Sequence, residues 1–337
     1  MMDIVAGSVI LIVLLGPLLF EPFERNLEVF FLIVGVLGTV VMGQSSWSLV
    51  LRALCEPVAL TAAVLVFGAM FRLLRPSIDR WFASAIKIFG PRWLCFGLTL
   101  TLGLLSSIIT AIIAALLLSE GIAQLKLDRR SEVFASVLAC FGIGLGASLT
   151  PIGEPLSTIV IGSLNADFWY LARLVGPFVL AGILIAAMLV SFVRTGDGVT
   201  HPIRERESWR LIFLRAGKVY IFIVGLVALS HALHPRVGVY LVRAPDALLF
   251  WINTLSAVLD NAMLAAIEIG PALHAHQQRA ALLSLLVSGG MLIPGNIPNI
   301  VAAARLQIRS REWALAGLPI GLALLMVGFL ALSLASI

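Results

Sequence analysis

The sequence predicts an all-α polytopic membrane protein with inverted repeats, each containing a re-entrant hairpin and a broken transmembrane helix. Three observations lead to this prediction: an extreme apolar composition, an uneven distribution of basic residues among the loops, and a matched pair of helix breaks. Of the 337 residues, 60% are hydrophobic and 12% are charged, whereas soluble domains contain about 45–50% apolar and about 25% charged residues. A water-soluble core of this size cannot enclose so much apolar surface, so we expect lipid to cover a single integral membrane domain over residues 1–337.

Ten apolar runs follow one another along the chain with short polar segments between them. They cover residues 5–20, 28–44, 48–71, 93–122, 133–164, 168–193, 209–233, 247–272, 280–304 and 313–336. Since about 20 residues cross a bilayer, the run 93–122 is too long for one crossing and too short for two. The run 247–272 has Asn253, Asp260 and Asn261 in its middle. We expect both runs to be re-entrant hairpins, because backbone that turns at membrane depth is tolerated only inside protein or beside a water-filled cavity.

The basic residues support this topology independently of any motif. With the N-terminus outside, most of the 23 Lys and Arg residues fall in cytoplasmic loops, at 72–92, 126–130, 194–218 and 305–311. This is the asymmetry expected for the cytoplasmic side of an inner (cytoplasmic) membrane protein. Treating 93–122 as one crossing would place the next basic cluster outside. We therefore expect eight crossings and two hairpins that enter from opposite faces, with 72–92 as an amphipathic helix on the membrane surface.

The order of hairpin and broken helix occurs twice. Residues 105–111 align with 255–261, and each segment precedes an apolar run that Pro and Gly interrupt, first at 150–158 and then at 293–299. Aligning Gly153 with Gly295 pairs Glu154 with Asn296 and Ser157 with Asn299. Repeat 1 is expected over about 28–164, repeat 2 over about 168–304, and a last helix over 313–336. A single such break would be an ordinary kink, but paired breaks in inverted repeats are typical of secondary transporters.

Asp260 is the first candidate for ion binding, because a carboxylate near the bilayer centre is costly and marks ion or proton pathways. Asn261, Ser256 and Asn253 lie close to it in the sequence and offer hard oxygen ligands. Alternatively, Asp260 is structural and caps the second arm of the hairpin. Glu154, at the first break, could ligate a cation, carry a proton or neutralise the exposed amides of the following half-helix. Further candidate oxygens are Thr150, Ser157, Thr158, Asn296, Asn299, Ser106, Ser107 and Thr110.

Other features exclude several functional classes. No P-loop, nucleophile–base motif or metal-ligand motif occurs, so we expect no enzymatic activity, no cofactor and no structural metal. The basic residues lie in loops between apolar runs, which indicates membrane orientation and no nucleic-acid partner. The expected partners are the lipid bilayer and small inorganic ions. Glu120 and Glu268 end hairpin arms, and we expect both at a membrane interface.

At these motifs the chain resembles the ion transporter superfamily, which contains NhaD-type sodium/proton antiporters, arsenite permeases and divalent-anion/sodium symporters. Residues 255–261 are similar to the hairpin-tip Asp-Asn motif of the NhaD type, and residues 150–155 are similar to the Gly-centred broken-helix motif. Over nearly its whole length, the chain resembles more closely an uncharacterised bacterial and archaeal family regarded as cation transporters, DUF1646. The resemblance implies scaffold and transport domains, an elevator-like motion and a homodimer. The chain departs from the superfamily in its short length, in the Ser-Ser-Ile-Ile-Thr of its first hairpin and in a second broken helix without an acid.

We therefore expect a secondary active cation transporter that exchanges Na⁺ for H⁺, with Asp260 binding either ion. One alternative is a Na⁺-coupled symporter of a small anion, similar to dicarboxylate or arsenite permeases. It would need an anion pocket built from half-helix N-termini or from an arginine near the breaks, and the nearest arginines are Arg173 and Arg305. An alternative of another class is a structural membrane subunit without transport activity, which would have no need of an ionisable Asp260.

Overall fold

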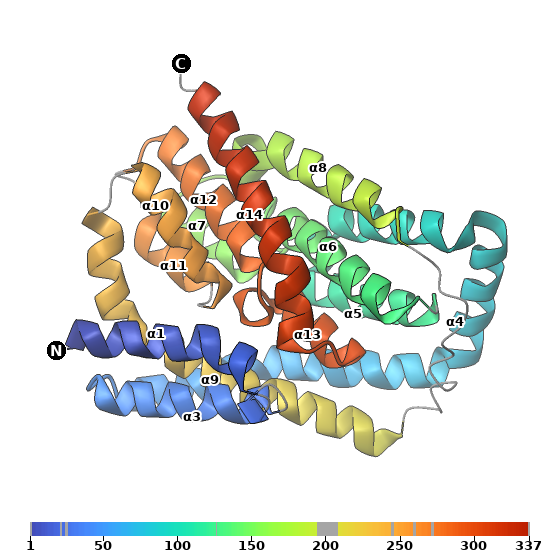
Figure 1. Cartoon of the computed structure of the whole chain (residues 1–337), viewed down its shortest axis with the longest axis horizontal. Coiled ribbons are helices and arrows are strands. Elements are labelled where there is room, and N and C mark those ends of the chain that lie inside the picture. The colour runs from blue at the N-terminus through green and yellow to red at the C-terminus, as the bar shows by residue number, and fades with distance from the viewer. Residues whose placement is uncertain are drawn as a thin grey trace.

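The computed structural model describes residues 2–20, 22–23, 26–125, 127–193, 208–243, 246–258, 261–270 and 273–335, and these residues form helices and connecting turns without any strand. The helices are α1 (Met2–Leu19), α3 (Leu27–Val41), α4 (Trp47–Ile109), α5 (Ala111–Gln124), α6 (Arg129–Ala147), α7 (Pro155–Leu164), α8 (Tyr170–Val190), α9 (Trp209–Arg243), α10 (Asp246–Ile252), η1 (Asn253–Ala257), α11 (Asn261–Glu268), α12 (Ala275–Gly289), η2 (Ile293–Gly295), α13 (Ile297–Leu306) and α14 (Ser310–Ala335). Figure 1 shows their arrangement.

Several helices have the length and composition of membrane spans. Within the described residues, five helical segments are long and apolar enough to cross a bilayer: Ser84–Ile109, Arg129–Ala147, Tyr170–Val190, Trp209–Leu233 and Ser310–Ser333. Shorter apolar helices accompany them, including α3 with 15 residues and the half-helices α7 and α13 with 10 residues each. These helices, together with the many large apolar side chains on the surface, indicate a membrane protein.

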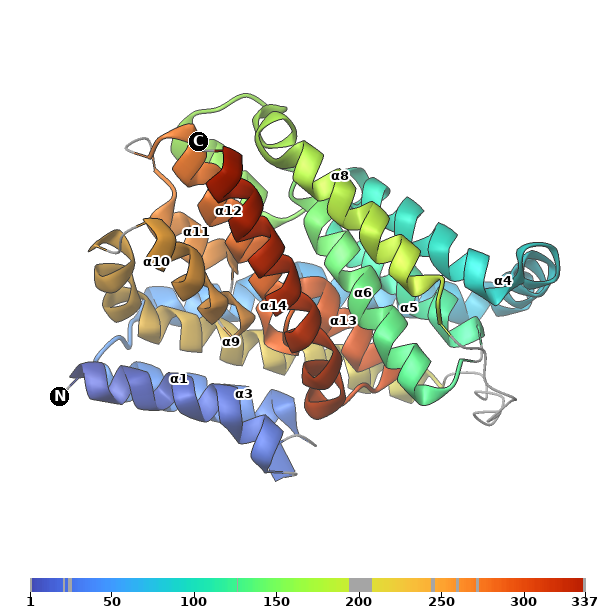
Figure 2. The same ribbon diagram turned by 45° about the horizontal axis from the view of Figure 1, so that its top comes forward.

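One side of the molecule is a layer formed by α1, α3, α9 and the first part of α4 (Figures 1 and 2). The backbones of α3 and α9 approach closely at two glycines. A Cβ atom at Gly35 would overlap the carbonyl oxygen of Gly225, and one at Gly225 would overlap the backbone of Phe31 and Leu32. Small residues at such a crossing let helix backbones pack closely in a membrane.

The segment predicted as an amphipathic surface helix, 72–92, is the middle of the long helix α4. Gly90, with φ of 74° and ψ of 160°, interrupts this helix, in a backbone region that is accessible essentially to glycine alone. The helix resumes at Pro91, and Figure 1 shows α4 turning back on itself around this segment. The final part of α4 and α5 pack against each other and form the first hairpin, whose tip lies at Thr110.

The loops with the most basic residues gather at one end of the molecule, which we call the basic end. It contains residues 72–92, 127–130, 209–218 and 305–312. The Arg72 guanidinium lies 4.9 Å from the centre of the Trp209 ring, and Arg129 forms an ion pair of 2.7 Å with Glu312. At the opposite end, the Tyr170 hydroxyl hydrogen-bonds the Gln278 side chain and connects the starts of α8 and α12. Most of the predicted loop 194–208 lies outside the described residues.

Both predicted helix breaks are confirmed. Helix α6 ends at Ala147 and α7 begins at Pro155, while α12 ends at Gly289 and α13 begins at Ile297. Proline stands at the start of each second half-helix, where its missing N–H costs nothing. The second hairpin comprises α10 and η1 on one arm and α11 on the other. Asp260, at its predicted tip, lies outside the described residues.

Candidate functional site

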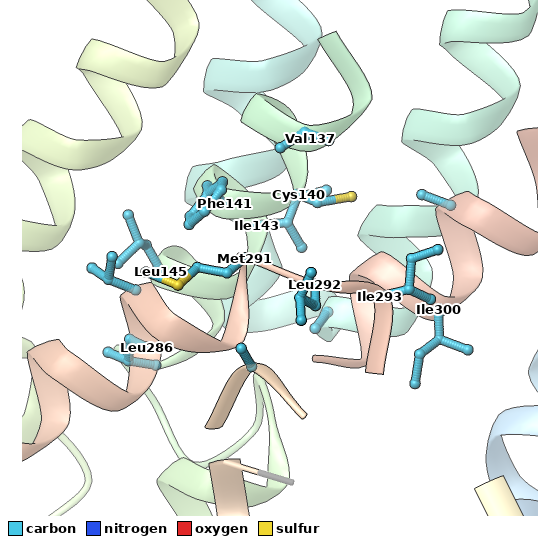
Figure 3. Packing of buried hydrophobic residues seen from close by; sticks show 14 of the residues in the cluster. Val137, Cys140, Phe141, Ile143, Leu145, Leu286, Met291, Leu292, Ile293 and Ile300 are labelled. Carbon is cyan, nitrogen blue, oxygen red and sulfur yellow. The ribbon is translucent and has the colours of Figure 1, made fainter. Parts of the chain in front are cut away.

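The two broken helices meet in the interior of the protein. Figure 3 shows residues of α6, among them Phe141, beside Met291 and Leu292 of the second break. The contact is close, since a Cβ atom at Gly290 would overlap the Phe141 ring. The Cys140 thiol also lies 3.6 Å from the carbonyl oxygen of Pro298. The first half of the first broken helix therefore packs against the second break in the interior of the protein.

Each second half-helix also packs against a hairpin from the other half of the chain. Helix α7, after the first break, contacts α11 of the second hairpin, and α13, after the second break, contacts α5 of the first hairpin. Through these contacts, each hairpin lies beside the broken helix of the other half of the chain. Each of these contacts joins one half of the chain to the other.

The first hairpin tip is hydrogen-bonded to the first break. The Ala111 N–H donates to the Gly153 carbonyl at 2.9 Å, and the Thr150 hydroxyl donates to the Ser107 carbonyl. Thr110 has a φ of 73° and caps α5 by accepting from the Ile113 N–H. A non-glycine residue with positive φ is strained and persists only where its surroundings hold it. Hairpin and break thus form one connected unit.

The second hairpin meets the second break in a similar way. The Ser256 hydroxyl donates to the Leu285 carbonyl at 3.2 Å. A Cβ atom at Gly289 would lie 3.4 Å from Asn261 Nδ2 and 3.6 Å from Ser256 Oγ, so both polar side chains lie beside the end of α12. A Cβ atom at Gly295 would lie 2.7 Å from the Ser256 carbonyl. Ser256, Asn261 and the second break therefore lie together.

Corresponding residues of the two hairpins make corresponding contacts. Ser106 donates to the Ile143 carbonyl at 3.0 Å, just as Ser256 donates to Leu285. In the alignment that pairs Gly153 with Gly295, Ile143 is the counterpart of Leu285. Cβ atoms at Gly153 and Gly295 would both crowd the last carbonyl of the preceding half-helix, that of Ala147 or Gly289 respectively.

The polar residue four positions after each break glycine holds the break together. Ser157 donates to the Ser148 carbonyl at 3.1 Å, and its counterpart Asn299 donates to the carbonyls of Gly289 and Leu292 at 2.9 and 2.8 Å. Both side chains are fully buried. Carbonyls at the end of a helix have no partner within that helix, so these side chains supply the hydrogen bonds that the break removes.

Glu154 and Asn296 occupy equivalent N-cap positions, immediately before the first residue of each second half-helix. Their backbone angles nearly coincide, with φ and ψ of −155° and 160° for Glu154 and −153° and 149° for Asn296. Both side chains are buried, and the Asn296 carbonyl oxygen accepts from the Ile297 N–H at 2.8 Å. A carboxylate at the Glu154 position lies at the positive end of the α7 dipole, as expected for neutralising exposed amides.

Buried polar atoms without a hydrogen-bond partner among the described residues concentrate in the second half of the chain. They include Asn253 Oδ1, Asn261 Nδ2, Glu268 Oε1, Ser288 Oγ and Asn299 Oδ1. A buried polar atom without a partner costs about 1–3 kcal/mol. In the described residues, no group of three His, Cys, Asp or Glu side chains could hold a metal ion. At the second break the unpartnered oxygens are the Ser288 hydroxyl and the Asn299 amide oxygen, and such neutral oxygens together with unwound carbonyls suit a monovalent cation.

The remaining predicted residues lie near the breaks but bond to the backbone. The Ser107 hydroxyl donates to the Leu104 carbonyl at 3.0 Å, and the exposed Thr158 donates to the Pro151 carbonyl at 2.6 Å. Asn253 is fully buried, but its amide nitrogen is bonded to Glu268 and Ser284. The structure therefore groups Asn253 with residues that the sequence analysis did not select as site residues.

The expectation that Glu120 and Glu268 reach an interface is wrong, because both side chains are buried. Glu268 is 9% exposed, and its Oε2 accepts from Asn253 Nδ2 at 3.0 Å. Glu120 is 1% exposed and forms an ion pair of 2.6 Å with Arg305. The contact between Asn253 and Glu268 could have been predicted from the sequence. The two residues are equally far from the predicted hairpin tip at Asp260 and Asn261, so they face each other when the hairpin closes.

The Glu120–Arg305 pair connects the first hairpin to the second broken helix, and the loss of Arg305 is expected to destabilise the protein. Replacing Arg305 by alanine leaves a buried carboxylate without its cation, which typically costs about 3–5 kcal/mol. The matched double variant Glu120→Leu with Arg305→Met should recover most of the lost stability. Thermal unfolding in detergent measures both effects. Equal stability of Arg305→Ala and the wild type would show that this pair does not hold the two helices together.

The comparison with curated proteins gives no match. A family model described as "Protein of unknown function (DUF1646)" matches residues 4–335, which is nearly the whole chain. The match spans both hairpins and both breaks. The chain, a helical protein of membrane type, therefore belongs to the DUF1646 family of proteins of unknown function.

Proposed function

We propose that this protein is a secondary active cation transporter that exchanges Na⁺ for H⁺. The observation that carries the proposal is the second break, where Ser256, Asn261, Ser288 and Asn299 lie around the end of a half-helix. Among the described residues, Ser288 Oγ and Asn299 Oδ1 are buried oxygens there without a hydrogen-bond partner. Free carbonyls and helix C-termini at membrane depth coordinate cations in transporters with discontinuous helices. A structural subunit would have no use for such costly unpaired atoms.

The corresponding contacts of the two halves support an inverted repeat. Beyond the hairpin and glycine contacts described above, α7 and α13 both have 10 residues and both end at a residue in the left-handed conformation, Asn165 with φ of 48° and Gln307 with φ of 54°. These two residues are also counterparts in the alignment. An inverted repeat can exchange its two conformations and so expose a central site alternately to each side.

The layered arrangement supports a division into a scaffold and a moving part, and a homodimer would form through the scaffold. In this proposal α1, α3, the first part of α4 and α9 form the scaffold. A cavity of about 390 Å³ lies between α3, α9 and α13. Its lining includes Ile293 in the second break as well as Glu28 and Lys218, which form an ion pair of 2.7 Å. The cavity therefore lies between the proposed scaffold and part of the second broken helix.

Asp260 would bind Na⁺ and H⁺ in competition, which couples the two fluxes, and Glu154 would act as a second ligand or proton carrier. An intramembrane carboxylate is the group that accepts either ion. The sequence supports the role of Asp260, and the burial of Glu154 at the first break supports the role of Glu154. The orientation proposed from the basic residues makes the basic end cytoplasmic and leaves the N-terminus outside.

Anion symport is less well supported, because both candidate arginines are engaged by carboxylates. Arg305 is paired with the buried Glu120. Arg173 is paired with Asp167 in an exposed loop, where the hydrogen bond from the guanidinium holds the pKa of Asp167 below its usual range. An anion pocket at the breaks would therefore have to rely on the half-helix N-termini.

The test is Na⁺-driven proton movement in proteoliposomes that contain a pH-sensitive dye. We expect added Na⁺ to dissipate an imposed proton gradient with wild-type protein and not with Asp260→Asn, because the variant cannot exchange a proton at that position. Correct insertion of both proteins is checked by protease accessibility. If wild-type vesicles show no response to Na⁺, Li⁺ or K⁺, cation/proton antiport is refuted. Uptake of a radiolabelled dicarboxylate or arsenite that depends on Na⁺ would instead establish symport.

A further inference from the structure

A second buried polar cluster lies apart from the break. It consists of Asn253, Glu268 and Ser284, which we call the Asn253 cluster. Asn253 Nδ2 lies 3.0 Å from Glu268 Oε2 and 2.8 Å from Ser284 Oγ. Asn253 and Ser284 are fully buried and Glu268 is 9% exposed. The three residues come from η1, α11 and α12, so the cluster joins both arms of the second hairpin to the first half of the second broken helix.

The hydrogen-bond donors of the Asn253 cluster are used within the protein. The Asn253 amide donates to Glu268 and Ser284, and the Ser284 hydroxyl donates to the Ala281 carbonyl at 2.9 Å. The atoms left without a partner among the described residues are both acceptors, Asn253 Oδ1 and Glu268 Oε1. In the described part of the chain, no Lys, Arg or His forms an ion pair with Glu268. A buried site with only acceptors remaining is suited to a cation.

The first half of the chain shows that helix packing does not require these polar groups. In the alignments of the two halves, Asn253, Glu268 and Ser284 correspond to Gly103, Leu118 and Gly142. Two of these counterparts also come together, since a Cβ atom at Gly103 would lie 3.3 Å from the Gly142 carbonyl. Leu118 is buried as Glu268 is, at 1% exposed, so the first half of the chain fills these positions with glycine and leucine.

The Asn253 cluster lies between the break and the end of the molecule opposite the basic end. Helix α12 starts at that opposite end, where Gln278 contacts Tyr170, and it finishes beside the break at Gly289. Ser284 precedes Gly289 by five residues, which corresponds to about 7–8 Å along a helix. An ion that moves between the opposite end and the break would pass close to the cluster.

We propose that the Asn253 cluster is a second binding site for a monovalent cation, with Glu268 Oε1 and Asn253 Oδ1 as its ligands. A single carboxylate matches one unit of charge, and the described residues contain no group of three acids, histidines or cysteines for a more highly charged ion. The inference deepens the proposed function and rests on it for the role of the site. In that role, the cluster holds an ion before it reaches the break or after it leaves.

The experiment is equilibrium binding of radioactive Na⁺ to purified protein in detergent, together with the proteoliposome assay on the same preparations. We expect two Na⁺ ions per wild-type chain and one for Glu268→Gln, which keeps the size of the side chain without its charge. Glu268→Asp should retain the second ion with about tenfold weaker affinity, a loss of about 1.4 kcal/mol. Glu132→Gln is the matched control, because Glu132 is also a buried carboxylate but is paired with Arg129 at the basic end.

The outcomes separate the inference from the proposed function. Unchanged Na⁺ stoichiometry and affinity in a folded Glu268→Gln, with antiport present in the wild type, overturn the second site alone. If Glu268→Gln binds one Na⁺ fewer than the wild type, the second site is supported. If the wild type also shows no antiport in proteoliposomes, the proposed antiport function is overturned while the site stands. A reduction of the same size in Glu132→Gln would show a general effect of removing buried charge and would also overturn the site. If Glu268→Gln does not fold, Ser284→Ala tests the same site, and this variant should bind one of the two Na⁺ ions with lower affinity.

Discussion

Gly295→Ala is expected to reduce Na⁺-driven proton flux to the level of vesicles without protein. The added methyl group would lie 2.5 Å from the Gly289 carbonyl oxygen, 2.7 Å from the Ser256 carbonyl oxygen and 3.0 Å from Ala257 Cα. These are backbone atoms, which cannot rotate away as a flexible side chain can. The second hairpin and the second break would have to separate, and the oxygens around the proposed cation site would lose their arrangement.

The matched control for this change is Gly162→Ala. Gly162 lies in the half-helix α7, and a Cβ atom there meets nothing within 4 Å. Alanine also has a higher helix propensity than glycine, so this variant should transport as the wild type does and be at least as stable. Proteoliposome flux and thermal unfolding are measured for both variants. Wild-type flux in Gly295→Ala would show that the close contact between hairpin and break is not needed for transport.

Asn299→Ala is expected to weaken Na⁺ binding and transport by at least about tenfold. The asparagine donates to the carbonyls of Gly289 and Leu292, and its Oδ1 is a buried acceptor at the proposed site. An unsatisfied buried group costs about 1–3 kcal/mol, and 1.4 kcal/mol corresponds to a factor of ten in affinity. The loss should appear in both the Na⁺ dissociation constant and the flux.

Asn299→Ser tests whether Na⁺ binding depends more on the hydrogen bonds from Asn299 to the backbone carbonyls or on its amide oxygen. Serine is the residue at the equivalent position of the first break, where Ser157 bonds two backbone carbonyls. The variant should therefore fold with the stability of the wild type and bind Na⁺ with intermediate affinity. If Asn299→Ala and Asn299→Ser both bind Na⁺ as the wild type does, Asn299 is not part of the cation site.

The positions of the breaks could be predicted from the sequence, because Pro and Gly interrupt helices through their own backbone chemistry. Break residues such as Gly153 and Gly295 need no distant partner to be recognised. The pairing of Glu154 with Asn296 likewise emerged from local motifs, and the backbone angles of the two residues agree. The function of Asp260, by contrast, stays a prediction from the sequence.

The burial of Glu120 and Glu268 could not be predicted, because it depends on which helix packs against each hairpin arm. Glu120 is neutralised by Arg305, 185 residues away in the sequence, and no local pattern indicates such a partner. Glu268 meets Asn253 and thereby Ser284 only because the hairpin closes against α12. A carboxylate at the end of an apolar segment has the same local sequence whether it faces water or a partner.

The sequence by itself determined the membrane character of the protein, the interruption of two helices and the polar residues around those interruptions. These properties follow from composition and from the backbone preferences of single residues. Only the tertiary structure decided that Asn299 bridges the carbonyls of the break, that Arg305 is held by Glu120, and that Asn253, Glu268 and Ser284 form a separate cluster. The physical reason is that hydrogen bonds and ion pairs act over a few ångströms, so they depend on packing between distant segments.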